Sequence, residues 1–323
     1  MRHTLLTGLA GLSFALGAPA LAQDMGTAVA DPATQTAPAP YEPAAPAAYE
    51  PAVTTTADPA TEDAPFSGLY VGGSFGGAVQ PGDGGSFIRF DRGLDGNFGD
   101  TVTTGAGANA FGAPVGGFCS GAATTATSLT SPAGGFCSKD RDGIEYYGKV
   151  GFDVQAGKIV FGALGEFGRA EIRDSVSAFS TTPAAYILTR KIEWEATARA
   201  RLGFVAGRST LFYGTGGGGY VSLDRDFRSI GNSANAFEVR GKRRQFGFVA
   251  GGGVEQMIGN NFSIGLEYLF HQYQDKDTRG RVTQGTAPST NPFVANGSAG
   301  TDFRRSDPRF SWHSLRATAA LRF

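Results

Sequence analysis

The sequence predicts an all-β protein, an eight-stranded antiparallel transmembrane β-barrel with short periplasmic turns and long extracellular loops. From residue 66 onward, apolar and polar side chains alternate with period two over stretches of 10 to 14 residues. Strands of soluble proteins usually have about 5 or 6 residues, whereas a tilted membrane strand needs about 9 to 11. Gly accounts for 49 of 323 residues, and the mean hydropathy of -0.14 is too polar for a bundle of membrane helices.

The first residues are typical of an exported protein. Arg2 and His3 precede an apolar stretch over residues 5–18, which is followed by an Ala-Leu-Ala cleavage box at 20–22. We therefore expect residues 1–22 to be a signal peptide. An uncleaved membrane anchor is the alternative, but the apolar stretch is short and is broken by Gly and Pro.

Residues 23–65 differ in composition from the rest of the chain. They are dominated by Ala, Pro and Thr, and their charged residues are all acidic. Such a segment cannot bury a core, and the near-repeats at 41–44 and 49–52 favour a semi-extended spacer. We expect an Ala/Pro-rich acidic periplasmic linker, with a peptidoglycan or partner role as the alternative, followed by the barrel over residues 66–323.

The expected strands cover residues 67–79, 144–156, 159–172, 191–204, 211–223, 245–256, 262–273 and 310–323. The segment 191–204 shows the alternation best, because every even-numbered residue from Ile192 to Phe204 is apolar. One side chain set lies on each face of a strand. The position of each residue in this alternation predicts which side chains face lipid. These are Trp194, Leu202, Phe248, Leu266 and Leu321.

The separations between these strands alternate between short and long. Tight turns are expected at 156–158, 206–210 and 257–261, and long loops at 80–143, 173–190, 224–244 and 274–309. This is the pattern of bacterial barrels, which have short periplasmic turns and long external loops. An even strand count also lets the sheet close, so that no strand edge leaves backbone polar groups unpaired in hydrocarbon.

The opposite parity predicts a polar interior. An eight-stranded barrel has a lumen just wide enough for side chains to fill, so the charges should form an ion-pair network, although a proton or ion path is the alternative reading. The expected interior residues are Lys149, Asp153, Glu166, Glu193, Glu195, Arg199, Arg201, Glu255, Glu267, Arg316 and Arg322.

Both cysteines lie in the first long loop, within two copies of Gly-Gly-Phe-Cys-Ser at 116–120 and 134–138. An exported protein folds in an oxidising compartment. We therefore expect a disulfide between Cys119 and Cys137.

Basic residues gather in the last two long loops. Anionic lipopolysaccharide would lie nearby, and Arg suits contacts with phosphate, but ordinary solvated charge explains the loops equally well. The residues are Arg225, Arg228, Arg240, Lys242, Arg243 and Arg244 in one loop and Lys276, Arg279, Arg281, Arg304, Arg305 and Arg309 in the other.

Other motifs carry little chemistry. Residues 214–219 match a dinucleotide-binding glycine pattern and residues 72–76 match a hydrolase elbow, but neither precedes an expected helix. His271 and His313 have no obvious carboxylate partner in the sequence, so no zinc site or nucleophile relay is indicated. With 28 basic and 29 acidic residues, the charge balance gives no reason to expect a nucleic-acid partner.

Four motifs carry a resemblance that covers about residues 66–323. They are FSGLYVGGSFGG at 66–77, IEWEATARARLGF at 192–204, LFYGTGGGGY at 211–220 and FSIGLEYLF at 262–270. The chain resembles the opacity-type porin family of eight-stranded barrels, related to the transmembrane domain of OmpA. The terminal Phe323 resembles the aromatic signature by which the barrel-assembly machinery recognises outer-membrane proteins.

These expectations combine into one functional hypothesis. The protein is expected to be a monomeric surface protein of the bacterial outer membrane, with a plugged polar lumen and external loops for interaction or adhesion to an extracellular or host ligand. A narrow porin for small solutes is the alternative. A lipid-modifying enzyme is a third reading, but it needs a Ser, His and carboxylate set that the sequence does not assemble. No enzyme activity, metal or cofactor is expected.

Overall fold

The computed structural model describes residues 64–113, 115–121, 123–124, 137–182, 184–231 and 234–323. The predicted signal peptide and almost all of the predicted linker lie outside these residues. In the described ranges, no helix has the length and apolar character that crossing a membrane requires.

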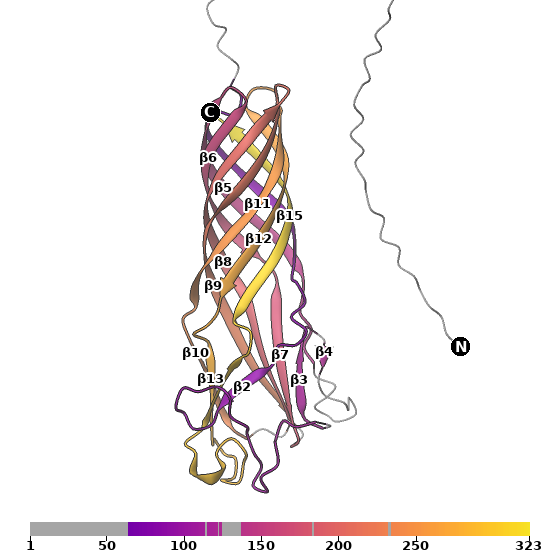
Figure 1. Cartoon of the computed structure of the whole chain (residues 1–323), viewed down its shortest axis with the longest axis vertical. Helices are drawn as coiled ribbons and strands as arrows, with labels where there is room; N and C mark the ends of the chain where they lie inside the picture. The colour runs from indigo at the N-terminus through magenta and orange to yellow at the C-terminus, as the bar shows by residue number, and fades with distance from the viewer. Residues whose placement is uncertain (1–63, 114, 122, 125–136, 183, 232–233) are drawn as a thin grey trace, which may run out of the picture. The chain divides into compact units, whose positions relative to one another are not determined.

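Within the described residues, eight antiparallel strands close into a ring (Figure 1). The order around the ring is β8-β6-β5-β1-β15-β12-β11-β9, and β9 pairs again with β8. The all-β barrel fold that the alternation predicts is therefore confirmed. The strands are β1 (Gly68–Val79), β5 (Gly143–Ala156), β6 (Ile159–Ala170), β8 (Ala184–Ala206), β9 (Thr210–Gly231), β11 (Arg244–Ile258), β12 (Phe262–Gln274) and β15 (Arg309–Arg322).

The outer face of the ring is apolar. Phe75 is 60% exposed, Phe167 62% and Leu202 57%. Ser74, Glu166 and Arg201, which directly precede them in the chain, are buried, as the period of two requires. Of the residues predicted to face lipid, Leu202, Phe248, Leu266 and Leu321 are all exposed, and Trp194 is partly exposed.

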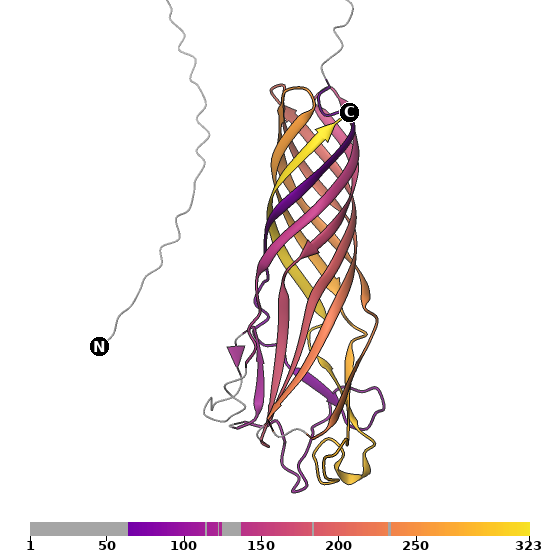
Figure 2. The ribbon, with the colours of Figure 1, turned by 180° about the vertical axis from the view of Figure 1, so that it is seen from behind.

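The segments predicted as long loops fold into further strands at one end of the barrel (Figures 1 and 2). β8 and β9 continue beyond the ring, and β7 (Arg173–Ser180) pairs with the first part of β8. β3 (Gly117–Ser120) and β4 (Ala123–Thr124) follow at the edge. A second sheet has the order β10 (Ala236–Arg240), β13 (Arg279–Thr283), β14 (Thr301–Arg305) and β2 (Ile88–Asp91).

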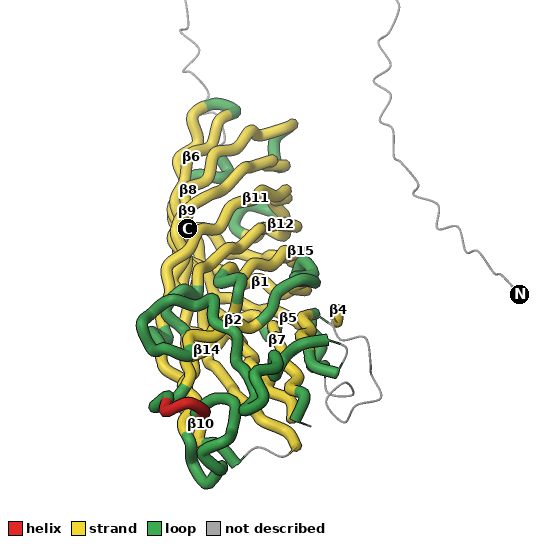
Figure 3. The backbone as a smooth tube through the Cα atoms, turned by 60° about the horizontal axis from the view of Figure 1, so that its bottom comes forward, coloured by secondary structure: helices red, strands yellow, loops and turns green. Residues whose placement is uncertain are grey.

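We call this region the extension. It comprises the described segments between β1 and β15 that lie outside the ring at this end of the barrel, with the distal parts of β8 and β9 and with β2, β3, β4, β7, β10, β13 and β14. Figure 3 shows the backbone of this region. Its two sheets enclose an apolar core. A short 3-10 helix, η2 (Ala295–Gly297), lies between β13 and β14. The core contains Ile88, Phe90, Phe111, Val176, Tyr186, Leu188, Phe293 and Phe303.

The prediction of a loop at 173–190 is wrong for a physical reason. Almost every residue of β7 and of the N-terminal part of β8 is buried. The side chains are therefore covered on both faces of the sheet. At the start of β8, residues 184–188 are all apolar, so no alternation between apolar and polar residues marks the strand there. The alternation therefore marks only the part of each strand whose two faces meet different surroundings.

Candidate functional site

Two layers of ion pairs cross the lumen. In the first, Asp153 on β5 and Glu255 on β11 lie on strands that are four places apart in the ring, and so on opposite walls. Arg201 donates to Asp153 at 2.9 Å and to Glu255 at 2.8 Å. Arg322 donates to the same two carboxylates at 2.9 and 2.7 Å. Each guanidinium thus bridges opposite walls.

The second layer repeats this arrangement with different strands. Glu166 on β6 and Glu267 on β12 are also on opposite walls. Arg199 contacts Glu166 at 2.6 Å and Glu267 at 3.0 Å, and Arg316 contacts both at 2.7 Å. All four side chains are at most 3% exposed. Since each charge has partners of opposite sign, the desolvation penalty of burial is offset by direct contacts.

Tyrosine rings fill space around the two layers, and glycines make room for them. Arg201 and Arg322 lie 5.0 and 4.7 Å from the centre of the Tyr70 ring. A Cβ at Gly151 would collide with this ring. Part of the high Gly content therefore serves the packing of the lumen. Lys149 is buried in the same interior, but it forms no ion pair with any residue that the structure describes.

A third polar cluster lies at the extension end of the lumen, and sequence reasoning missed it. Glu195 accepts hydrogen bonds from Tyr147 at 2.5 Å and from Tyr273, and it lies 2.9 Å from Nδ1 of His271. His271 therefore has a carboxylate partner that is not obvious from the sequence. The alternation along each strand could have placed both residues in the lumen, because both occupy inward positions. It could not have paired them, because their strands are not neighbours.

Glu193 is the predicted interior residue that the structure places elsewhere. The β8–β9 register shifts between Ile192 and Trp194, so β8 contains a β-bulge. One extra residue reverses the inward and outward sets on one side of a bulge. Ile192 is consequently buried at 1% exposure, and the Glu193 side chain is 47% exposed and lies 3.5 Å from Arg243.

Cys119 and Cys137 form a disulfide, as expected from the sequence. Phe179 and Ala185 pack in the same small apolar cluster as Cys119. The disulfide therefore joins Cys137 to β3, which pairs with β7 outside the barrel ring.

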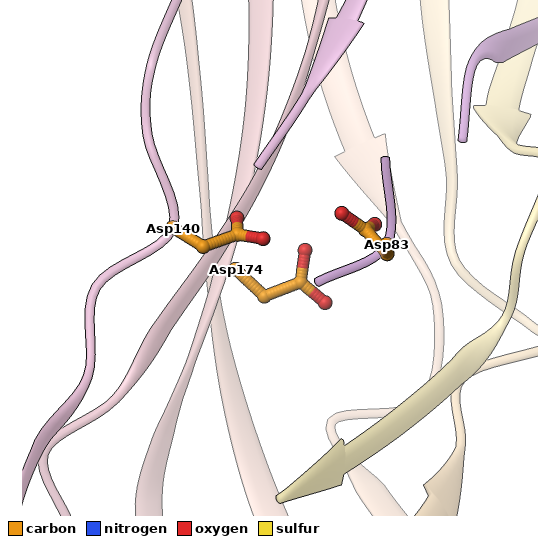
Figure 4. A group of neighbouring side chains, drawn as sticks. All are labelled: Asp83, Asp140 and Asp174. Atoms are coloured by element: carbon orange, nitrogen blue, oxygen red, sulfur yellow. The ribbon is translucent and has the colours of Figure 1, made fainter. Parts of the chain in front are cut away.

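Next to this cluster, Asp83, Asp140 and Asp174 bring their carboxylates within 4.8 Å of one another (Figure 4). Arg305 contacts Asp83 at 3.1 Å and also Asp174, and Arg190 contacts Asp174 at 2.6 Å. Two guanidinium groups therefore already supply the positive charge. We describe the group as an ion-pair cluster.

The carboxylates of this cluster have different acidities. Burial raises the pKa of Asp140 to about 7, and the nearby Asp174 and Asp83 add to the rise. Burial also opposes ionisation of Asp174, but Arg190 and Arg305 outweigh it and hold the pKa of Asp174 below its ordinary value. Asp140 therefore changes charge near neutral pH.

No protein-family model matches the chain. It is 34% identical over 112 residues to the 31 kDa outer-membrane immunogenic proteins of Brucella melitensis and Brucella suis, covering 35% of this chain and 46% of each relative. It is 30% identical over 141 residues to the 22 kDa outer membrane protein of Rhizobium leguminosarum, covering 43% of this chain and 57% of that protein. The chain thus spans about half the length of the curated relatives it matches.

The chain is an outer-membrane protein. Among solved structures, it is similar to Ail, the attachment invasion locus protein of Yersinia pestis in complex with the heparin analogue sucrose octasulfate. The TM-score is 0.28 at 11% identity, covering 79% of this chain and 99% of that one.

The membrane location explains the exposed outer face of this outer-membrane protein. The apolar side chains contact lipid, the short turns are periplasmic, and the extension is extracellular. Near the extension, outward rings follow one another across neighbouring strands: Phe167, Trp194, Tyr220 and Phe246, with centroids 5.8, 5.8 and 4.5 Å apart. Such aromatic girdles mark the membrane–water interface.

Proposed function

We propose that the protein is a monomeric surface protein whose barrel is a closed anchor and whose extension makes contacts outside the cell, including interaction or adhesion. One observation supports the proposal that the lumen is closed. Arg199, Arg201, Arg316 and Arg322 each bridge carboxylates on opposite walls, in two successive layers. Eight strands leave little more than side-chain volume inside, so these cross-links replace a water column.

The folded structure of the extension supports a role in contacts outside the cell. Flexible loops lose conformational entropy when they bind. Here the two sheets already enclose an apolar core, so the surface is organised before any partner arrives. The proposed partners are lipopolysaccharide, the barrel-assembly machinery acting on the C-terminal strand and an extracellular or host ligand.

We also propose that the protein is not an enzyme. Ser314 donates to Glu145 at 2.7 Å, whereas His271 contacts Glu195. Both His271 and Ser314 are fully buried. A hydrolase acting on membrane lipid needs a serine and histidine in direct contact at a surface that lipid can reach, and these residues face the lumen.

Single-channel recording tests the closed lumen. The full-length protein, inserted into a planar bilayer, should give no steady conductance at either polarity. Removing opposite-wall contacts with the double variant Glu166→Gln and Glu267→Gln provides the comparison, and Arg208→Gln in an exposed periplasmic turn is the matched control. A reproducible, ion-selective conductance of the unmodified protein would overturn the proposal and establish a narrow porin.

A further inference from the structure

A basic cavity opens in the extension beside β10, β13 and β14, and Phe98 of the first long loop also lines it. It has a volume of about 590 Å³. Gly241 allows its wall to form, since its φ is +143° and a Cβ there would lie 2.8 Å from the carbonyl oxygen of Asp277. The cationic lining consists of Arg240, Lys242, Lys276, Arg279, Arg281 and Arg304.

Part of this positive charge is neutralised locally and part is not. Arg281 pairs with Asp302 through contacts of 2.5 and 2.8 Å, and Arg240 pairs with Glu238. Within the described residues, Lys276 and Arg279 form no ion pair, and both are exposed. Their charges are available to a ligand.

Two further cations are held only loosely. Lys242 lies 3.8 Å from Asp277, and its side chain is 81% exposed. The guanidinium of Arg304 lies 4.1 Å from the ring centre of Phe98, and in the described part of the chain it has no carboxylate partner. A cavity with this lining suits an anion that carries more than one phosphate, because several donors can each take a separate oxygen.

The cavity lies close to the membrane surface. Lys242 comes four residues before Phe246, the 79% exposed end of the aromatic girdle, so at most about 14 Å of extended chain separates them. Lys276 comes two residues after the end of β12, the neighbour of β11 in the ring. A phosphate just outside the hydrocarbon layer can therefore reach both sides of the cavity.

We propose that this cavity binds the phosphate groups of the outer-leaflet glycolipid, the bisphosphorylated lipid A part of lipopolysaccharide. This inference rests on the proposed surface role and names one of its partners. Lys276 and Arg279, which have no ion-pair partner in the described part of the chain, contribute free charges, and Lys242 and Arg304 complete the cationic wall. The acyl chains continue down the apolar outer face of β11 and β12.

The test compares lipid A binding to purified full-length variants in detergent, measured by native mass spectrometry. The double variant Lys276→Glu and Arg279→Glu should bind bisphosphorylated lipid A roughly tenfold or more weakly than the unmodified protein. The control, Lys158→Glu and Arg208→Glu, makes the same charge change in exposed periplasmic turns and should bind normally. Enzymatically dephosphorylated lipid A should bind weakly to all three proteins.

Soluble pyrophosphate distinguishes a lipid from a free phosphate. Lipid A should bind the unmodified protein at least about tenfold more tightly, because its acyl chains also bury apolar surface. Equal affinities for the two probes, or equal lipid A binding by the variant and the control, would overturn the inference. Conductance is recorded on the same preparations, so an open channel would overturn the proposed function alone.

Discussion

At the scale of single residues, the lumen contains charged side chains. Burying one of them alone is unfavourable, and pairing it with an opposite charge offsets that cost. Taking an isolated charge out of water costs several kcal/mol, which direct partners must offset. Asp153 is fully buried and contacts two guanidinium groups. Loss of either guanidinium would leave a carboxylate with half of its compensation, which makes individual arginines in the lumen sensitive to substitution.

Arg201→Ala tests this sensitivity. We expect the substitution to lower the free energy of unfolding by about 3 to 5 kcal/mol, because it leaves Asp153 and Glu255 undercompensated. Urea unfolding of protein folded into phospholipid vesicles, followed by tryptophan fluorescence, measures the change. Arg208→Ala in an exposed turn is the control. A loss below about 1 kcal/mol, the range of an exposed pair, would show that the network contributes little.

Asp140 predicts a pH dependence of the extension. The pKa of this group is raised from 3.8 to about 7 on folding, so between these values the folded protein binds a proton that the unfolded chain does not. Its contribution to stability therefore falls as pH rises from about 4 to about 7. Asp140→Asn keeps an acceptor for the N–H of Ser175, which lies 2.8 Å away, but cannot ionise.

We expect Asp140→Asn to slow hydrogen exchange of the β7 amides at pH 8, relative to the unmodified protein, and to have little effect at pH 4. Each comparison is made at one pH, so that intrinsic exchange rates cancel. Asp142→Asn, at an exposed neighbouring position, should show no such difference. A gain in protection that is larger at pH 4 than at pH 8 would contradict the assigned direction.

At the scale of secondary-structure elements, β8 shows how one residue controls a register. Its 23 residues serve two environments, the membrane barrel and the extension. Just before the bulge, Arg190 and Ile192 are the buried residues, whereas after it the odd-numbered residues from Glu195 onward face the lumen. Even and odd positions in a strand lie on opposite faces. By shifting this assignment, the bulge lets one strand place its side chains correctly in both environments.

Ala198→Arg tests the outward assignment after the bulge. Ala198 is exposed on the outer face, between the buried Thr197 and Arg199. A cation there should destabilise the folded protein by about 2 to 4 kcal/mol if it lies near the bilayer midplane. Ala198→Leu should be nearly neutral in the same urea measurement. Equal stability of the Arg and Leu variants would show that this face does not contact lipid.

At the scale of the whole molecule, the barrel and the extension have different sources of stability. The barrel is apolar outside and ionic inside, whereas the extension has an apolar core between two sheets. The disulfide belongs to the extension, since Cys119 lies on β3. Changes to it should therefore affect one part and spare the other.

Replacing both cysteines by serine tests this separation. The disulfide closes a separation of 18 residues, which is worth about 3 kcal/mol on a chain-entropy estimate. We expect faster proteolysis within the extension and no change in the urea midpoint of the barrel. Alkylation before lysis should find no free thiol in the unmodified protein. Unfolding of the barrel in the serine variant would refute the separation.

The sequence by itself determined the barrel and most of its lumen. Wherever one face of a strand meets lipid and the other meets the polar interior, the alternation of residues such as Leu202 and Arg201 assigns the faces. Turn lengths and alternation then indicated eight strands and nearly all interior charges. The repeated Gly-Gly-Phe-Cys-Ser motif likewise indicated the disulfide.

The tertiary structure alone decided the bulge at Glu193, the pairing of His271 with Glu195, and the folded extension. The alternation of apolar and charged residues runs unbroken from Ile192 to Glu195, because Ile192 is apolar on either face, so it gives no sign of the bulge. Contacts across the lumen join strands that are distant in sequence, so spacing cannot identify the partners. In the extension, both faces of β7 and the first part of β8 are buried. Where both faces are buried, alternation cannot mark the strand. Only the packing against the second sheet explains why Tyr186 and Leu188, at the start of β8, are apolar.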